Sequence, residues 1–205
     1  MKLIPSLIAA AAALAAGAAS AQVTGAIGGL DNSANFLALS SANVSGGALY
    51  SDAQNFPSTA ARPQSTTPSI VTVGNWLAAG PSNSNNGGGD ATLTLAAGTT
   101  WVSFLWGSPD TYNTLTVNTN AGSLSFTAAA LGILPVGGSQ SQANYVNFSV
   151  AGGATAITSL VFSSPNTNAF EIANVTAVPE PGSYALMATG LAVLGFVGRR
   201  RRQRG

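Results

Sequence analysis

The sequence predicts an all-β fold, an antiparallel β-sandwich of jelly-roll type, and two observations lead to this prediction. Between residues 90 and 177, short runs alternate apolar and polar side chains, as half-buried strands do. Clusters of glycine, proline, asparagine and serine separate these runs, and about seven short strands in such an arrangement are typical of sandwiches. The domain is expected to be flanked by an N-terminal signal peptide and a C-terminal transmembrane helix.

Residues 1–21 have the features of a secretory signal peptide. Lys2 provides a positive charge, residues 3–16 form a short alanine-rich apolar stretch, and an Ala-Ser-Ala sequence ending at Ala21 fits a small-residue cleavage site. We expect signal peptidase to cleave there, which makes Gln22 the first residue of the mature chain. The protein is therefore expected to be exported.

Residues 22–89 form the N-terminal part of the mature region, and they are rich in glycine, serine, asparagine and proline. Only short apolar pieces interrupt this part, such as residues 70–73 and 76–77. Residues 83–89 form a polar, glycine-rich loop. The strands of the sandwich are therefore expected in residues 90–177.

Within this second part, the predicted strands share an alternating pattern and flanking turn residues. They are 91–95, 100–106, 114–117, 123–126, 145–150, 157–162 and 170–172. Residues 128–134 fit either a helical turn or a further strand.

The alternation also assigns faces to the tryptophans. Trp106 shares a face with Phe104 and is expected in the core, whereas Trp101 lies on the opposite face, where it can be exposed. Exposed tryptophans can stack on sugar rings, so a carbohydrate-binding site is one interpretation. The other interpretation is that these two residues and Trp76 all pack in the sandwich or at its edge.

Charged residues are rare in the mature region. Between Gln22 and Val178, Arg62 is the only basic residue and stands against five carboxylates, which gives a net charge of −4. Such a domain lacks the basic patch that nucleic-acid binding needs, so nucleic acid is excluded as a partner. The chain has no cysteine, so no disulfide is expected to stabilise it.

The residue types present exclude most catalytic chemistry. The chain has no histidine, no cysteine and no lysine besides Lys2, which excludes His-based triads, cysteine nucleophiles and a Ser–Lys dyad in the mature domain. A carboxylate pair, as in glycoside hydrolysis, remains. However, Asp110 follows Ser108 and Pro109 and is expected to cap a turn. Glu171 is expected to be a solvated strand residue or a surface ligand. The sequence therefore predicts that the protein is not an enzyme.

No metal or cofactor is predicted either. Asp90 follows a glycine-rich loop and could contribute an oxygen ligand to Ca²⁺. Neither EF-hand spacing nor a repeated Asp-Gly loop accompanies it.

Residues 178–205 combine three features, of which the first is a proline-bracketed segment. This segment consists of Val178, Pro179, Glu180 and Pro181. Each proline fixes its own φ angle and disfavours helix in the preceding residue, so the segment is expected to be extended and accessible.

The second feature is an apolar helix over residues 184–198, and the third is a cluster of arginines. A helix of this length spans about 22 Å, whereas the hydrocarbon core of a membrane is about 30 Å thick. The helix can therefore cross the membrane only under strain. The cluster consists of Arg199, Arg200, Arg201, Arg202 and Arg204. These charges are expected to remain cytoplasmic, which places the preceding domain outside the membrane.

These three features, in this order, resemble the sorting signal of PEP-CTERM proteins. The resemblance rests on residues 178–181, the apolar segment and the arginines, and it covers about an eighth of the chain. It implies transient anchoring in the inner membrane, processing by an exosortase near the motif, and sorting to the cell envelope, the cell surface or the extracellular matrix. Residues 104–110 and 170–175 also resemble short motifs of β-domains that often precede such a tail, which supports the fold and supplies no activity.

Two functions from different classes are compatible with these features. The first is an exported surface or matrix protein that is structural or adhesive and associates with extracellular polysaccharide. Its partners during export are signal peptidase and exosortase. The alternative is a secreted carbohydrate-binding module for a defined glycan. We favour the first because the sorting signal is clear and no convergent polar and aromatic site is evident in the sequence.

Overall fold

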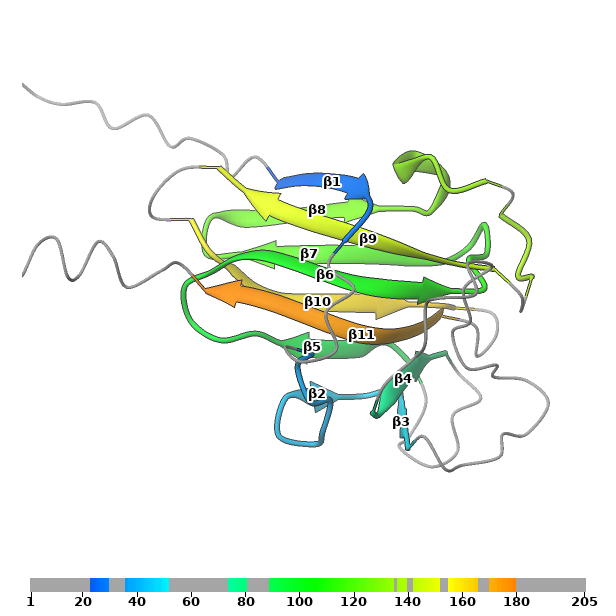
Figure 1. Ribbon diagram of the computed structural model, residues 1–205, viewed down its shortest axis with the longest axis horizontal. Coiled ribbons are helices and arrows are strands. Elements are labelled where there is room, and N and C mark those ends of the chain that lie inside the picture. Colours follow the sequence, from blue (N-terminus) through cyan, green and yellow to red (C-terminus); the bar gives the residue numbers. More distant parts are fainter. Residues whose placement is uncertain are drawn as a thin grey trace, which may run out of the picture.

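The computed structural model of the chain describes residues 23–29, 36–51, 74–80, 89–134, 136–139, 142–151, 155–165 and 170–179. Within these ranges, two antiparallel sheets pack face to face (Figure 1). The predicted all-β sandwich is confirmed.

The larger sheet has six strands in the order β1-β9-β6-β11-β4-β3. Their bounds are β1 Val23–Ile27, β9 Ala143–Val150, β6 Thr99–Gly107, β11 Phe170–Pro179, β4 Trp76–Ala79 and β3 Ala48–Tyr50. The long strands β6, β9 and β11 therefore lie side by side in this sheet.

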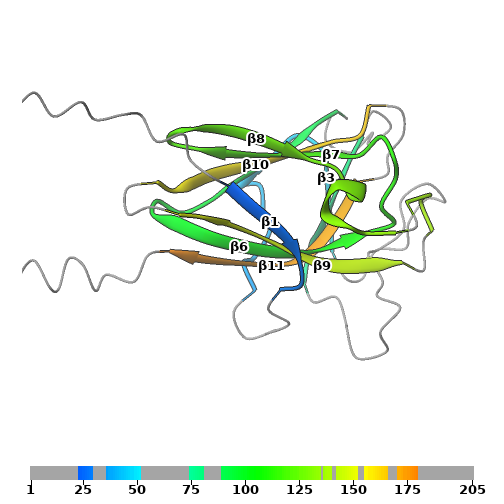
Figure 2. The same cartoon turned by 90° about the horizontal axis from the view of Figure 1, so that it is seen from above.

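The smaller sheet has five strands in the order β2-β5-β10-β7-β8. Their bounds are β2 Val44–Ser45, β5 Ala91–Thr94, β10 Ile157–Ser163, β7 Thr114–Thr119 and β8 Gly122–Phe126. Figure 2 shows β7, β8 and β10 as one layer above β6, β9 and β11. A 3₁₀ turn, η2 Ala129–Leu131, follows β8, so the helical alternative for residues 128–134 is the one observed.

Every strand predicted after residue 90 is present, and two differences from the prediction stand out. The last strand continues from Phe170 to Pro179, well beyond the predicted 170–172. Strands β1 to β4 also come from residues before 90 and complete both sheets. These four strands are two to five residues long and contain glycine, alanine and serine, so their alternation is too short to detect.

The core between the sheets is aromatic at its centre. The ring centroid of Phe104 lies 5.4 Å from that of Phe162 and 5.9 Å from that of Phe148. Trp106 stacks on Phe170 at 4.3 Å and is fully buried, as predicted. Because these rings come from β6, β9, β10 and β11, they join the two sheets through one contiguous apolar cluster.

Part of the outer face of the six-stranded sheet is buried as well. Tyr50 stacks on Trp76 with centroids 4.7 Å apart, and Leu105 and Tyr145 belong to a further buried cluster. All four residues of β4 are buried. A polar residue that alternates outward on this sheet therefore does not necessarily reach solvent.

A β-bulge interrupts β11 near its middle. The register with β6 shifts between Ala173 and Thr176, and Asn174 adopts a left-handed conformation with φ 54°. Asparagine tolerates this region better than most residues. Ile172 before the bulge and Val175 after it both contribute to the core. The extra residue thus keeps the apolar side chains of both halves directed inward.

Strand β1 begins and strand β11 ends at the same end of the six-stranded sheet. Val23 pairs with Val150, and the neighbouring Ser149 pairs with Trp101, which in turn pairs with Val178. Figure 1 shows both positions on the left side of the view. The chain therefore enters and leaves the described fold at one end.

Candidate functional site

The predicted sorting segment begins inside strand β11. Val178 pairs with Trp101 and Pro179 pairs with Thr99, both on β6. Proline has no backbone N–H, so a strand accepts it mainly at an end, at an edge or at a bulge. Pro179 is the last residue of β11, and the register shifts directly before it. Glu180 and Pro181 lie outside the described residues.

On its other edge, the second half of β11 has little backbone pairing. Strand β4 pairs only with residues 170–172 of β11. Further along, the N–H of Leu37 donates a hydrogen bond of 2.6 Å to the carbonyl oxygen of Val175. A short irregular segment, residues 36–40, thus replaces the neighbouring strand.

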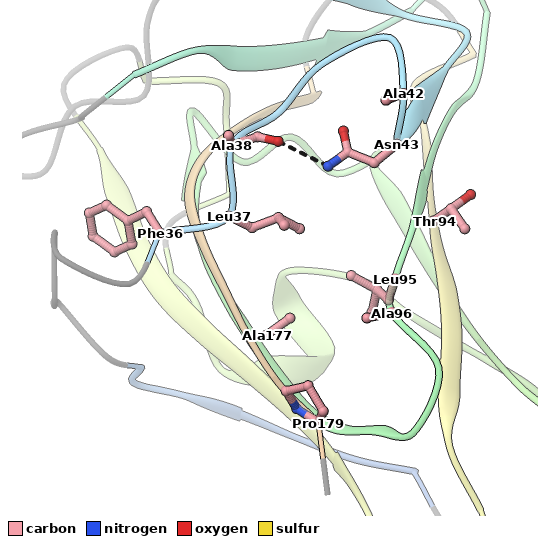
Figure 3. Close-up of a pocket in the computed structure, with 10 residues that line it drawn as sticks. All are labelled: Phe36, Leu37, Ala38, Ala42, Asn43, Thr94, Leu95, Ala96, Ala177 and Pro179. Carbon is pink, nitrogen blue, oxygen red and sulfur yellow. Dashed lines mark hydrogen bonds between the residues drawn. The ribbon is translucent and has the colours of Figure 1, made fainter.

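A groove with a volume of about 570 Å³ follows this edge (Figure 3). Leu37 and Leu95 point toward each other across it, and Ala177 and Pro179 of β11 line it. None of the described residues that line the groove is charged. It therefore offers an uncharged surface, mostly of apolar side chains with Asn43 and Thr94 among them, and no side chain for acid–base chemistry.

The prediction that Glu171 is solvated is wrong. Its side chain is directed to the outer face of the six-stranded sheet, as alternation requires, but only 2% of the residue is exposed because this part of the face is covered. Burial raises the pKa of Glu171 to about 8, and the charge of Asp110 adds to the effect. The hydroxyl of Ser108 donates a 2.5 Å hydrogen bond to Oε2 of Glu171, which lowers the pKa and offsets part of the rise.

Ser108 is held in an uncommon backbone conformation beside Glu171. Its φ is 36°, in the left-handed region that non-glycine residues rarely adopt, and its N–H donates to the carbonyl oxygen of Gln142 at 2.8 Å. The hydrogen bonds of Ser108 to Glu171 and Gln142 connect the end of β6 to β11 and to the residue before β9. Sequence reasoning did not identify this contact, because the two side chains are 63 positions apart.

Asp110 lies in a turn, where the sequence placed it. Its carbonyl oxygen accepts a 3.2 Å hydrogen bond from the N–H of Asn113, and its Oδ2 accepts a 2.9 Å bond from the hydroxyl of Tyr112. A side chain at Gly138 would come within 2.5 Å of Oδ1 of Asp110, so the loop 136–139 packs closely against this turn. Asp110 and Glu171 thus both accept hydrogen bonds from side chains of the fold.

Asn174 and Tyr145 form a second buried polar contact that the sequence did not predict. The side-chain amide of Asn174 donates a 2.9 Å hydrogen bond to the hydroxyl of Tyr145, and both residues are buried. This bond connects the bulge of β11 to β9 across the central strand β6.

Replacing Tyr145 by Phe is expected to lower the free energy of unfolding by about 1–3 kcal/mol, because a buried amide loses an acceptor. Denaturant unfolding would measure this effect. Tyr112→Phe is the matched control, since it removes a hydroxyl from a half-buried position and should cost less than about 1 kcal/mol. Equal losses in the two variants would contradict a special role for the bulge contact.

The remaining candidate residues are dispersed. Trp76 and Trp106 are both buried, in separate clusters. Trp101 is half-buried and paired with Val178, and Asp90 is exposed. In the part of the chain that the structure describes, no group of three or more His, Cys, Asp or Glu residues could hold a metal ion.

The other predicted processing features lie outside the described residues. They are the cleavage site at Ala21 and Gln22, the apolar helix 184–198 and the arginines Arg199, Arg200, Arg201, Arg202 and Arg204. Within the described ranges, no helix has the length and apolarity that crossing a membrane requires.

Comparison with known proteins gives one match, and it falls on the end of β11 and the residues that follow. Residues 177–202 match the family described as the PEP-CTERM protein-sorting motif. No curated protein and no solved structure matches the chain. The molecule is therefore a β-sandwich that carries a PEP-CTERM sorting motif at its C-terminal end. This motif implies that the protein is exported, sorted to the cell surface and processed by an exosortase.

Proposed function

We propose that the protein is a structural or adhesive component of the cell surface or the extracellular matrix, that it associates with extracellular polysaccharide, and that it has no catalytic activity. The sorting motif supports the location. The role of the domain itself rests on the chemistry of one face of the sandwich.

The outer face of the five-stranded sheet carries a network of hydroxyl and amide groups. The hydroxyls of Thr116 and Ser125 are 2.9 Å apart. The side-chain amide of Asn118 donates to the hydroxyl of Ser159 at 3.0 Å and accepts from the hydroxyl of Ser123 at 2.7 Å. The five residues come from the adjacent strands β8, β7 and β10 and are exposed or half-buried. We call this set the hydroxyl–amide face.

The hydroxyl–amide face is complementary in chemistry to a neutral polysaccharide. Hydroxyl and amide groups both donate and accept hydrogen bonds, as sugar hydroxyls do. Strands about 4.8 Å apart repeat these groups across the sheet, so a polymer can make many weak contacts at once. Each hydrogen bond replaces one to water and contributes only about 1 kcal/mol. Such a surface supports adhesion through repeated weak contacts and needs no deep binding pocket.

Co-sedimentation with the host's extracellular polysaccharide would test this proposal, with the processed protein recovered from the host. A Ser123→Glu/Ser125→Glu variant is expected to lose about ten-fold in binding, because two carboxylates must then be desolvated against the polymer. The matched control is Thr24→Glu/Ala26→Glu, which adds the same charge at exposed positions of β1 in the other sheet. A wild-type protein that does not bind, or equal losses in both variants, would contradict the proposal.

The alternative function, a carbohydrate-binding module for one defined glycan, rests on Trp101. This ring is half-buried on the outer face of the six-stranded sheet, where part of it can contact a sugar. Saturable binding to a single glycan on an array, lost in Trp101→Ala and retained in Ser123→Glu/Ser125→Glu, would favour this alternative.

A further inference from the structure

We propose that exosortase reaches the sorting motif only after the last residues of β11, Ala177 to Pro179, have detached from β6. The fold itself would then control the processing of its own tail. This inference rests on the processing that the motif implies and does not depend on polysaccharide association.

The first argument is the overlap between the motif and the sheet. The match to the sorting motif begins at residue 177, whereas β11 ends at Pro179. Val178 and Pro179 are paired with Trp101 and Thr99, so the backbone on this side already has a neighbouring strand. The opposite edge of this segment has little pairing, but an enzyme that encloses an extended substrate chain in its active site needs both backbone edges and the space around them. The motif and the sheet therefore compete for these residues.

The second argument is that no linker can relieve this competition. Four residues separate Pro179 from Tyr184, where the predicted apolar helix begins. A fully extended chain of this length reaches no more than about 18 Å. The end of the sandwich is therefore kept close to the membrane before processing, and the motif cannot move away from the fold while β11 is fully paired.

The third argument is that the end of β11 can open without the rest of the strand. Phe170 and Ile172, before the bulge at Asn174, are fully buried, and Ile172 is paired both with Leu77 of β4 and with Trp106 of β6. After the bulge, Val178 is 38% exposed and Pro179 is exposed. Detaching these residues gives up little buried apolar surface, and short segments with few buried contacts open at low cost.

A disulfide across β6 and β11 would test whether this opening is required. The chain has no cysteine, so a Trp101→Cys/Val178→Cys variant forms only the intended pair. Directly opposed residues of antiparallel strands have Cα atoms about 4.5–5.5 Å apart, which suits a disulfide. In membranes that contain exosortase, the oxidised full-length variant is expected to be processed about ten-fold more slowly or worse, and reductant should restore the rate.

Two controls separate this effect from other causes. The reduced form of the same variant reports the effect of losing Trp101 and Val178. A Thr116→Cys/Ser125→Cys variant puts an equivalent disulfide between β7 and β8, away from the motif, and should leave processing unchanged. Processing of the oxidised β6–β11 variant at the rate of its reduced form would overturn the proposal, while polysaccharide binding would remain a separate question.

Hydrogen exchange on the unprocessed wild-type chain gives a second test that needs no substitution. The amide of Val178 is expected to exchange about a hundred-fold faster than that of Ile172, because only the former lies in the part that opens. Equal protection of the two amides would show that β11 opens as one unit and would contradict the mechanism.

Discussion

The Glu171→Gln variant is expected to be more stable than the wild type by about 3 kcal/mol at pH 7, and to lose most of the pH dependence of unfolding between pH 4.5 and 8. Glutamine has nearly the same shape as a protonated glutamate and can accept the hydrogen bond from Ser108, but it has no proton to lose. Thermal unfolding monitored at several pH values would show the difference as a rise in Tm of about 10 °C at pH 7.

The sign of this effect follows from the direction of the pKa shift. The pKa of Glu171 is raised from 4.5 to about 8 on folding. The folded protein therefore keeps a proton on Glu171 that the unfolded chain releases above pH 4.5. The contribution of Glu171 to the free energy of unfolding is therefore most favourable below pH 4.5. It decreases by about 1.4 kcal/mol per pH unit until pH 8. Above that pH the contribution is constant.

An Asp90→Asn variant is the matched control, because it removes a carboxyl from an exposed position and leaves the buried site untouched. It should retain the wild-type slope between pH 4.5 and 8. If the Glu171→Gln variant also retained that slope, the buried carboxyl would not be the source of the pH dependence.

The second large effect is expected at the sorting motif, where Glu180→Ala or Pro181→Ala should leave the protein unprocessed in the membrane fraction. Glu180 is the only charged residue between Glu171 and Arg199, and the prolines on both sides are expected from the sequence to favour an extended segment. We expect the exosortase to contact this side chain, so its loss should reduce the processed fraction by about ten-fold or more. Intact mass of the protein from membrane and medium would measure both forms.

An Asp90→Ala variant controls for the loss of an acidic side chain elsewhere and should be processed normally. Replacing the four arginines 199–202 by alanine should instead alter membrane orientation or retention, which protease accessibility would detect. Fractionation of Glu180→Ala like the wild type would disprove the role that we assign to the proline-bracketed segment.

Strand alternation was sufficient to predict the central part of the fold. The alternation over residues 100–106 correctly placed Phe104 and Trp106 in the core, because that face of β6 is buried by the opposite sheet. Strands β1 to β4 were not predicted, since segments of two to five residues do not establish a period. Their positions depend on pairing with distant strands, which one sequence does not reveal.

The error at Glu171 has a different physical origin. Alternation correctly directs its side chain away from the core, but it does not tell whether the outer face is covered. The sequence also gave no sign of the pair with Ser108 or of the bulge at Asn174, because both depend on tertiary contacts. The sorting motif, by contrast, is a local pattern and could be recognised directly, although its overlap with β11 could not.

The common end at which β1 begins and β11 ends gives the molecule a polarity with respect to the cell. Strand β6 runs the length of the sheet from this end, and its nine residues span about 30 Å. The turn at residues 108–113 lies at its far end, as Figure 1 shows for the C-terminal end of β6. Before processing, the tail is expected to hold the opposite end near the membrane, so this turn would lie on the side of the domain that faces away from the membrane.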